Sequence, residues 1–158
     1  MAAAPPLDRI DRRILTFLQA EGRLTNQALA ERVSLSPSAC LARVRRLEVS
    51  GVIEGYHARL NPFVVDIGLI LFAEVTLRAH SPADLARFES GIQGFPQIVE
   101  ASHVSGAYDY LLKVVVLDMA EWNGIAHQLT HPEIGSERVN THVLMNKPKV
   151  FVGFSISI

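Results

Sequence analysis

The apolar pattern of this chain changes its period once, near Asn61-Pro62, and this change limits the possible folds more than any other feature. Before it, apolar residues recur every three or four positions, as they do on one side of an α-helix. After it, several runs alternate with a period of two, which is typical of strands. With 158 residues the chain is long enough to bury a core in one domain or in two small ones. The pattern predicts an α+β protein whose first part is helical and whose second part contains a sheet.

The first part is predicted to form a helix-turn-helix. Asp8, Thr25 and Ser36 are good helix N-caps, and Ser36-Pro37 combines a capping serine with a proline at the first helical position. Residues 34–36 make a short turn between the second and third helices, and residues 52–60 alternate loosely enough to form a small hairpin, or wing. The expected helices cover residues 7–21, 26–33 and 36–50.

Charge and side-chain size give the third helix two different faces. At 100° per residue, one side gathers Cys40, Leu41, Val44 and Leu47. The opposite face gathers Ser38, Ala39, Ala42, Arg45 and Arg46, with Arg43 at the boundary. Together with Ser36, these small residues and three arginines form the predicted binding face. Residues 1–62 carry nine arginines and no lysine against six acidic residues, a net charge of +3, whereas the remainder carries −4. Small residues allow close approach to base edges and arginines suit phosphates or guanine, so this face is predicted to bind double-stranded DNA. The alternative is a plain three-helix bundle with a solvated arginine face.

The second part has the order βαββαβ, which is that of the ferredoxin-like unit. Its strands are expected at residues 69–77, 96–104, 108–117 and 137–145, its helices at 81–94 and 118–131, and a further extended run, an edge strand, at 149–158. The predicted domains are a winged helix-turn-helix over residues 1–60, a linker over 61–68 and a ligand-binding and oligomerisation domain over 69–158.

One face of this sheet should lack a helical cover. The strand at 108–117 is apolar on both faces, with Leu111, Val115 and Leu117 on one and Tyr110, Leu112, Val114 and Val116 on the other. An uncovered apolar face of that size is typically buried by a partner, so we expect at least a homodimer. The alternative is that the linker or the first domain covers these strands.

The sequence offers little for catalysis or metal binding. It contains no dinucleotide-binding glycine motif, no P-loop and no nucleophile elbow. His127 and His131 have zinc-capable spacing, but the glutamate of the zinc protease motif is missing between them, so no metal site is expected. Cys40 is expected to be a small core residue. Met1–Pro6 lacks the features of a secretory signal and the longest apolar stretch, Ile67–Ala73, is too short to span a bilayer, which makes the cytoplasm the expected location.

The turn at Ser105-Gly106-Ala107 is the one place with the chemistry of a ligand site. Free N–H groups beside the glycine could hold a carboxylate, and Asp109 could hold an ammonium group, which together would suit an amino acid. The alternative is an ordinary hairpin turn with an exposed or cap-forming aspartate.

Three blocks of sequence resemble the Lrp/AsnC (feast/famine) family of prokaryotic transcription regulators. They are LDRIDRRIL (7–15) with GRLTNQALAERVSLSPSACLARVRRLE (22–48), GVIEGYHARLNP (51–62) and VSGAYDYLLKV (104–114). The resemblance implies a winged helix-turn-helix joined to a βαββαβ effector domain, DNA wrapping or bending, dimers that assemble to octamers, and an amino-acid effector bound between dimers. It implies no other cofactor. The effector residues implied are Val104, Ser105, Gly106, Tyr108, Asp109, Thr141 and His142.

Two alternatives remain beside that implication. One is an architectural DNA-binding protein with no effector. The other is an enzyme, since siroheme decarboxylases resemble the same family and would use histidines such as His103 and His142. Because the arginine-bearing third helix is intact, we expect a regulator without enzymatic activity.

Overall fold

The computed structural model describes residues 6–61, 64–65 and 67–157, and the chain divides into two compact units. The first unit comprises Met1–Arg59 together with Lys149–Ile158, and the second comprises Leu60–Pro148. The predicted linker at 61–68 includes residues 62, 63 and 66, which lie outside the described residues.

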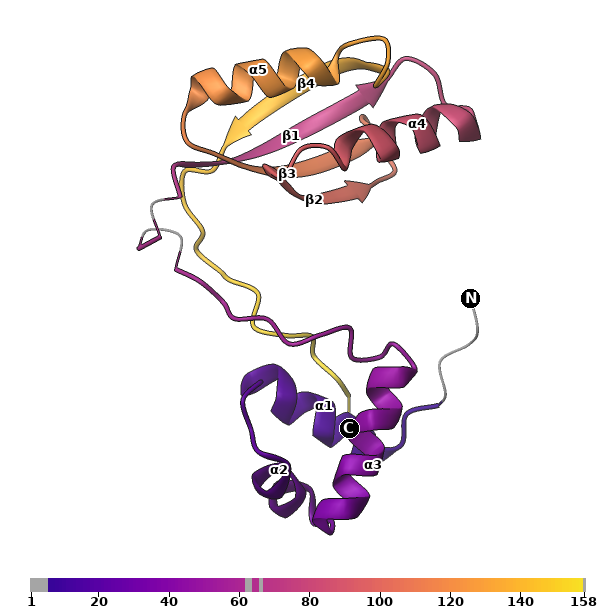
Figure 1. Ribbon diagram of the computed structural model, residues 1–158, viewed down its shortest axis with the longest axis vertical. Helices are drawn as coiled ribbons and strands as arrows, with labels where there is room; N and C mark the ends of the chain where they lie inside the picture. The colour runs from indigo at the N-terminus through magenta and orange to yellow at the C-terminus, as the bar shows by residue number, and fades with distance from the viewer. Residues whose placement is uncertain (1–5, 62–63, 66, 158) are drawn as a thin grey trace. The chain divides into compact units, whose positions relative to one another are not determined.

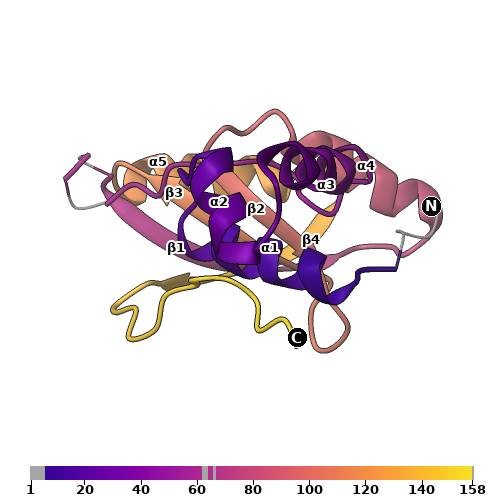
Figure 2. The same ribbon diagram turned by 90° about the horizontal axis from the view of Figure 1, so that it is seen from below.

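The helices of the first unit occur where the sequence predicts them. They are α1 (Arg9–Ala20), α2 (Asn26–Val33) and α3 (Pro37–Val49). They enclose a small core of Ile14, Leu15, Leu29, Ala30, Val33, Cys40 and Leu47, and Figure 2 shows the three helices grouped together. Burial raises the pKa of the Cys40 thiol, in agreement with its predicted place in the core. Leu41 was expected on the buried side of α3, but 38% of it is exposed and it does not belong to the helical core.

The segment after α3 departs from the prediction. Residues 52–60, all of which the structure describes, contain no strand, so the predicted hairpin is not formed. Val52 and Ile53 pack against the helical core, and their N–H groups both donate to the carbonyl oxygen of Leu47. The chain then continues extended. Its first two apolar residues pack on the helical core, whereas Tyr56 and Leu60 are exposed.

The last residues also differ from the prediction. Lys149–Ile158 was expected to join the second domain as an edge strand, but it belongs to the first unit and forms no strand within residues 149–157. The Gln19 side chain of α1 binds the backbone of Phe154 twice, donating from Nε2 to its carbonyl oxygen at 3.2 Å and accepting its N–H at 2.6 Å. Ile156 packs against the helical core. The Gln19 side chain, and not a neighbouring strand, therefore binds the backbone of this extended segment.

The second unit is the predicted βαββαβ fold, shown at the top of Figure 1. Its elements are β1 (Leu69–Leu77), α4 (Pro82–Ile92), β2 (Ile98–His103), β3 (Tyr110–Val116), α5 (Met119–Leu129) and β4 (Ser136–Val143). The four strands form one antiparallel sheet in the order β2-β3-β1-β4.

Helices α4 and α5 cover one face of that sheet, as Figure 1 shows. Alternate residues of β1 and β3 are buried against Phe88 and Ile92 of α4 and Trp122 and Leu129 of α5. The phenol of Tyr110 lies in this core and donates to Glu89, and burial followed by that bond raises its pKa to about 12.

Among the described residues of the second unit, no helix covers the other face, and we call it the open face. Its apolar residues Ile70, Phe72, Leu111 and Val115 are half-buried in the single chain. Leu117, predicted to belong to the same surface, follows the end of β3 and is 75% exposed. Two polar pairs lie on the same face, Glu74 with His142 at 3.3 Å and the ion pair of Glu100 with Lys113 at 3.8 Å. This combination of apolar side chains with flanking charges resembles a protein interface.

Candidate functional site

The turn between α2 and α3 is built by capping groups. The Thr25 and Ser36 hydroxyls each accept the N–H three residues later, and Pro37 occupies the first turn of α3. Ser34 ends α2 in the left-handed conformation with φ of 58°. The Asn26 side chain donates to the carbonyl oxygen of Pro37 at 2.8 Å, which joins the starts of the two helices. Local sequence therefore fixes the angle at which α3 is presented.

The small residues predicted to face DNA form an exposed surface at the start of α3. Ser36, Ser38, Ala39 and Ala42 are all exposed, and the hydroxyls of the two serines are 3.2 Å apart. No large side chain of α3 obstructs this end, so it can approach a flat or concave polar surface closely.

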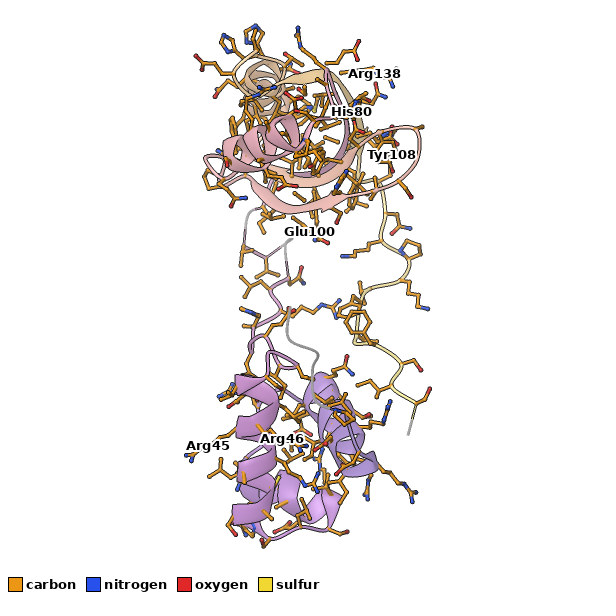
Figure 3. All side chains as sticks on the ribbon, turned by 90° about the vertical axis from the view of Figure 1, so that its right-hand side faces the viewer. Arg45, Arg46, His80, Glu100, Tyr108 and Arg138 are labelled. Carbon is orange, nitrogen blue, oxygen red and sulfur yellow. The ribbon has the colours of Figure 1, made fainter. Side chains whose placement is uncertain are left out.

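The three arginines of α3 have different surroundings. Arg43 Nη1 donates to Asp8 at 2.6 Å and to Asp11 at 2.9 Å, and Arg46 Nη2 donates to Asp11 at 2.5 Å. Their side chains are 28% and 48% exposed. Arg45 is exposed and makes no hydrogen bond or ion pair within the described residues. Figure 3 shows Arg45 extending away from the helices.

Asp8 and Asp11, which the sequence analysis did not select for this role, connect the start of α1 to α3. Asp8 is the N-cap of α1 and Asp11 closes its capping box, so each carboxylate also accepts a backbone N–H. The N–H of Asp11 and the Arg43 guanidinium lower the pKa of the Asp8 carboxyl to about 2, and the two carboxylates raise the pKa of Arg43. Asp11 has no solvent exposure. The D-x-x-D spacing at 8–11 indicated the helix cap. It did not indicate that these aspartates contact arginines more than 30 positions away.

The second candidate site is the loop between β2 and β3. The N–H of Val104 donates to the carbonyl oxygen of Asp109 at 2.8 Å, which closes the loop. Gly106 lies at its exposed tip with φ of 142°, a conformation that favours glycine, and Ser105 is exposed beside it. Tyr108 is half-buried. The structure thus brings the five predicted residues at 104–109 together in one loop.

The carboxylate of Asp109 already has partners. Its Oδ2 accepts the N–H of Leu77 at 2.7 Å, and its Oδ1 lies 3.0 Å from Nε2 of His80. Only 19% of the Asp109 side chain is exposed, against 61% for His80. His80 is therefore the outer member of the pair and was missed by the sequence analysis. The antiparallel pairing of β1 with β3 is the signal, because it brings the residues after Leu77 next to those before Tyr110.

Thr141 and His142 lie apart from this loop within one chain. Thr141 accepts the indole N–H of Trp122 at 2.8 Å and so points to the helix-covered face, whereas His142 points to the open face. Both belong to β4, which is separated from β3 by β1, so β4 and β3 lie about 10 Å apart. Adjacent residues of a strand point to opposite faces, so the two cannot line the same side of a pocket. Arg138 lies at the end of the sheet where His80 and Tyr108 also lie (Figure 3).

Metal and membrane signals are few in this chain. Among the described residues there is no group of three or more histidine, cysteine, aspartate or glutamate side chains placed to hold a metal ion. No helix in that part of the chain is both long and apolar enough to cross a membrane.

Comparison with known proteins assigns both units. A family model described as winged helix-turn-helix DNA-binding matches residues 7–54, and one described as Lrp/AsnC ligand binding domain matches residues 70–152. The leucine-responsive regulatory protein of Klebsiella pneumoniae is 44% identical over 143 residues, which cover 90% of this chain and 87% of that protein. An AsnC family transcriptional regulator from Agrobacterium tumefaciens is 33% identical with a TM-score of 0.83, over 94% of this chain and 97% of that one. A transcriptional regulator from Neisseria meningitidis in complex with L-methionine is 32% identical with a TM-score of 0.82, over 92% and 94%.

Proposed function

Since the chain belongs to the Lrp/AsnC family of DNA-binding transcription regulators, we propose that it binds double-stranded DNA through the exposed face of α3. The predicted family, the fold class and the regulatory function are confirmed by these matches. What remains a proposal is the set of residues that contacts DNA.

The exposed, unpaired Arg45 beside a surface of small residues carries this proposal. Ser36, Ser38, Ala39 and Ala42 give α3 a low profile that a major groove can accommodate. Arg45 supplies a free guanidinium for a phosphate or for the O6/N7 edge of guanine. Arg43 and Arg46, although predicted to contact DNA directly, are occupied by carboxylates, so we assign them a smaller direct part.

A salt titration of DNA binding tests this assignment. Arg45→Ala should weaken binding to a duplex from the region upstream of the protein's own coding sequence by about tenfold and reduce the salt slope by about one. Arg87→Ala removes the same charge from α4 and should leave both quantities unchanged. Equal affinity of Arg45→Ala and wild type at every salt concentration would exclude this face of α3.

We propose that two chains associate through the open face of the second unit, and that the dimers assemble further to an octamer. The half-buried Ile70, Phe72, Leu111 and Val115, flanked by two polar pairs, support association there. Two copies of α3 in a dimer would then read half-sites separated by about 34 Å, one turn of DNA, or a multiple of it.

We propose an amino acid as the effector, bound at the 104–109 loop between dimers. The L-methionine complex of the N. meningitidis relative supports the ligand class. Thr141 and His142 would have to reach this ligand from another chain, because they are distant from the loop in their own. No other cofactor is proposed.

An effector-independent architectural DNA binder is the second candidate, and the state of Asp109 favours it. Its carboxylate is engaged by Leu77 and His80, so an ammonium group would have to displace His80 or share the site with it. Titration with the twenty amino acids, followed by DNA affinity and thermal stability, separates the two candidates.

We propose that the protein acts in the cytoplasm and is not an enzyme. The histidines that a tetrapyrrole enzyme would use do not converge within a chain. His103 lies on β2 and stacks on Tyr110 at 4.7 Å. His142 lies on β4, at the opposite edge of the sheet, and pairs with Glu74 of β1. Absence of decarboxylation on addition of siroheme is the expected result.

A further inference from the structure

Two of the three arginines on the DNA-facing helix are bound to carboxylates of α1, and this arrangement has a consequence for selectivity. We propose that Asp8 and Asp11, here called the carboxylate clamp, are positioning residues that withhold Arg43 and Arg46 from the DNA backbone and so limit binding to non-specific sequences. The inference rests on the proposal above that α3 faces DNA.

The charges of the clamp and its arginines cancel. The Asp8 carboxyl, whose pKa is about 2, is ionised at neutral pH, and each of the two arginines carries one positive charge. Two carboxylates therefore face two guanidinium groups, joined by three contacts of 2.5–2.9 Å. Of the three positive charges on α3, only that of Arg45 has no ion-pair partner within the described residues.

A phosphate group of DNA cannot easily displace the carboxylates from Arg43 or Arg46. Asp11 is wholly buried and uses both carboxylate oxygens, accepting from Arg43 with Oδ1 and from Arg46 and a backbone N–H with Oδ2. Removal of either guanidinium would leave one oxygen of this buried carboxylate without its cationic partner, which is unfavourable. The clamp therefore holds while DNA is bound.

The clamp also sets the direction of the free arginine. Arg43 and Arg46 are three positions apart on α3 and so lie on the same side of the helix, the side next to α1. Arg45 is displaced from both by 100° or more and points away, as Figure 3 shows for Arg45 and Arg46. The orientation of α3 on α1 and the exposure of Arg45 are thus fixed by the same contacts.

Withholding cations lowers binding to any sequence. Each phosphate neutralised by a cation adds about 0.9 to the slope of log K against log salt, and this component does not depend on base sequence. In a specific complex, base contacts already fix the position of α3, whereas in a non-specific complex α3 can shift until each free cation meets a phosphate. Two additional free arginines would therefore strengthen non-specific binding more than specific binding. The clamp should therefore raise the ratio of specific to non-specific affinity.

The experiment measures fluorescence anisotropy of the full-length protein on two duplexes across a range of salt. One duplex is selected from a random pool by the wild-type protein, and the other is a scrambled duplex of equal length. The main variant is Asp8→Asn, because asparagine caps a helix as well as aspartate does and half of the Asp8 side chain is exposed. Its affinity for the scrambled duplex should rise about three- to tenfold, with a steeper salt slope, while its affinity for the selected duplex changes less.

Asp84→Asn is the matched control. Asp84 closes the capping box of α4 and pairs with Arg87, so this change removes the same charge from a capping box remote in sequence from α3. It should leave both salt slopes unchanged. An equal rise in Asp84→Asn would assign the effect to net charge and overturn the proposal.

A double variant separates positioning from simple stability. Asp8→Asn with Arg43→Ala should return the affinity for the scrambled duplex to the wild-type value, because the released charge is then absent. Unchanged or weaker binding of the scrambled duplex by Asp8→Asn, with an unchanged melting temperature, would overturn the proposal. If instead Arg45→Ala binds the selected duplex as wild type does, the assignment of α3 fails, whatever the clamp variants show.

Discussion

The two units of this protein differ in how far their charged and apolar side chains find partners within the single chain. In the first unit, two of the three arginines on α3 are paired with carboxylates of α1, and the apolar core is completed by a segment from the far end of the sequence. In the second unit, one sheet face is covered by two helices and the other retains half-buried apolar residues. If the open face is the interface proposed above, the second unit completes its apolar packing only with a further chain, whereas the first unit completes its core with its own C-terminal segment.

The strongest test of this difference is a charge on the open face. Phe72→Glu should raise the dissociation constant of the dimer at least 30-fold, corresponding to about 2 kcal/mol, because a carboxylate would be buried at the contact. Analytical ultracentrifugation measures it. Val49→Glu, at a residue of the first unit that is 90% exposed, should leave the dimer intact. A dimer of wild-type stability in Phe72→Glu would place the interface elsewhere.

A smaller effect is expected where the C-terminal segment completes the first unit. Ile156→Ala should lower the free energy of unfolding of that unit by about 1–2 kcal/mol, since the side chain packs against its core and is only partly buried. Hydrogen exchange of α1 amides measures this, and fluorescence of the single tryptophan, Trp122, follows the second unit separately.

Val152→Ala is the control for this prediction. Val152 lies in the same segment but is 70% exposed, so its change should be below about 0.5 kcal/mol. Equal protection of α1 in Ile156→Ala and wild type would show that the segment adds nothing to the core.

The smallest expected effect is a difference in acid sensitivity. The pKa of Asp8 is depressed from 3.8 to about 2, so its contribution to stability is present above pH 4 and is lost as pH falls toward 2. The pKa of Asp84 is also lowered, by the Ser81 hydroxyl and by Arg87. Asp8→Asn should make the amide protection of the first unit less dependent on pH between 4 and 2, without changing the second unit. Asp84→Asn should have the same effect on the second unit alone. An identical pH dependence in Asp8→Asn and wild type would remove the link between Asp8 ionisation and α3.

Helices and strands were largely predictable because their signals lie within a few residues. The caps at Asp8, Thr25 and Ser36 and the alternation along β1 need only neighbouring positions to be interpreted, and the structure agrees with them. The hairpin expected at 52–60 and the edge strand expected at 149–158 failed for the opposite reason. Alternation shows that a segment can form a strand, but a strand also requires a partner, and neither segment has one among the described residues.

The candidate sites show the same division between signals that lie close together in the sequence and contacts between distant segments. The sequence identified the exposed small residues of α3 and the loop at 104–109, since each is contiguous. It did not reveal that Arg43 is paired, that Asp109 contacts His80, or that Thr141 and His142 face opposite sides of the sheet.

By itself the sequence determined the helices, the four strands of the sheet, the family and the exposed small residues at the start of α3. Only the tertiary structure decided which of three arginines remains free and which unit owns the last residues. The Arg43–Asp8 contact spans 35 positions and the Gln19–Phe154 contact spans 135. Such contacts form only when the fold brings distant segments together, and no periodicity of the chain encodes them.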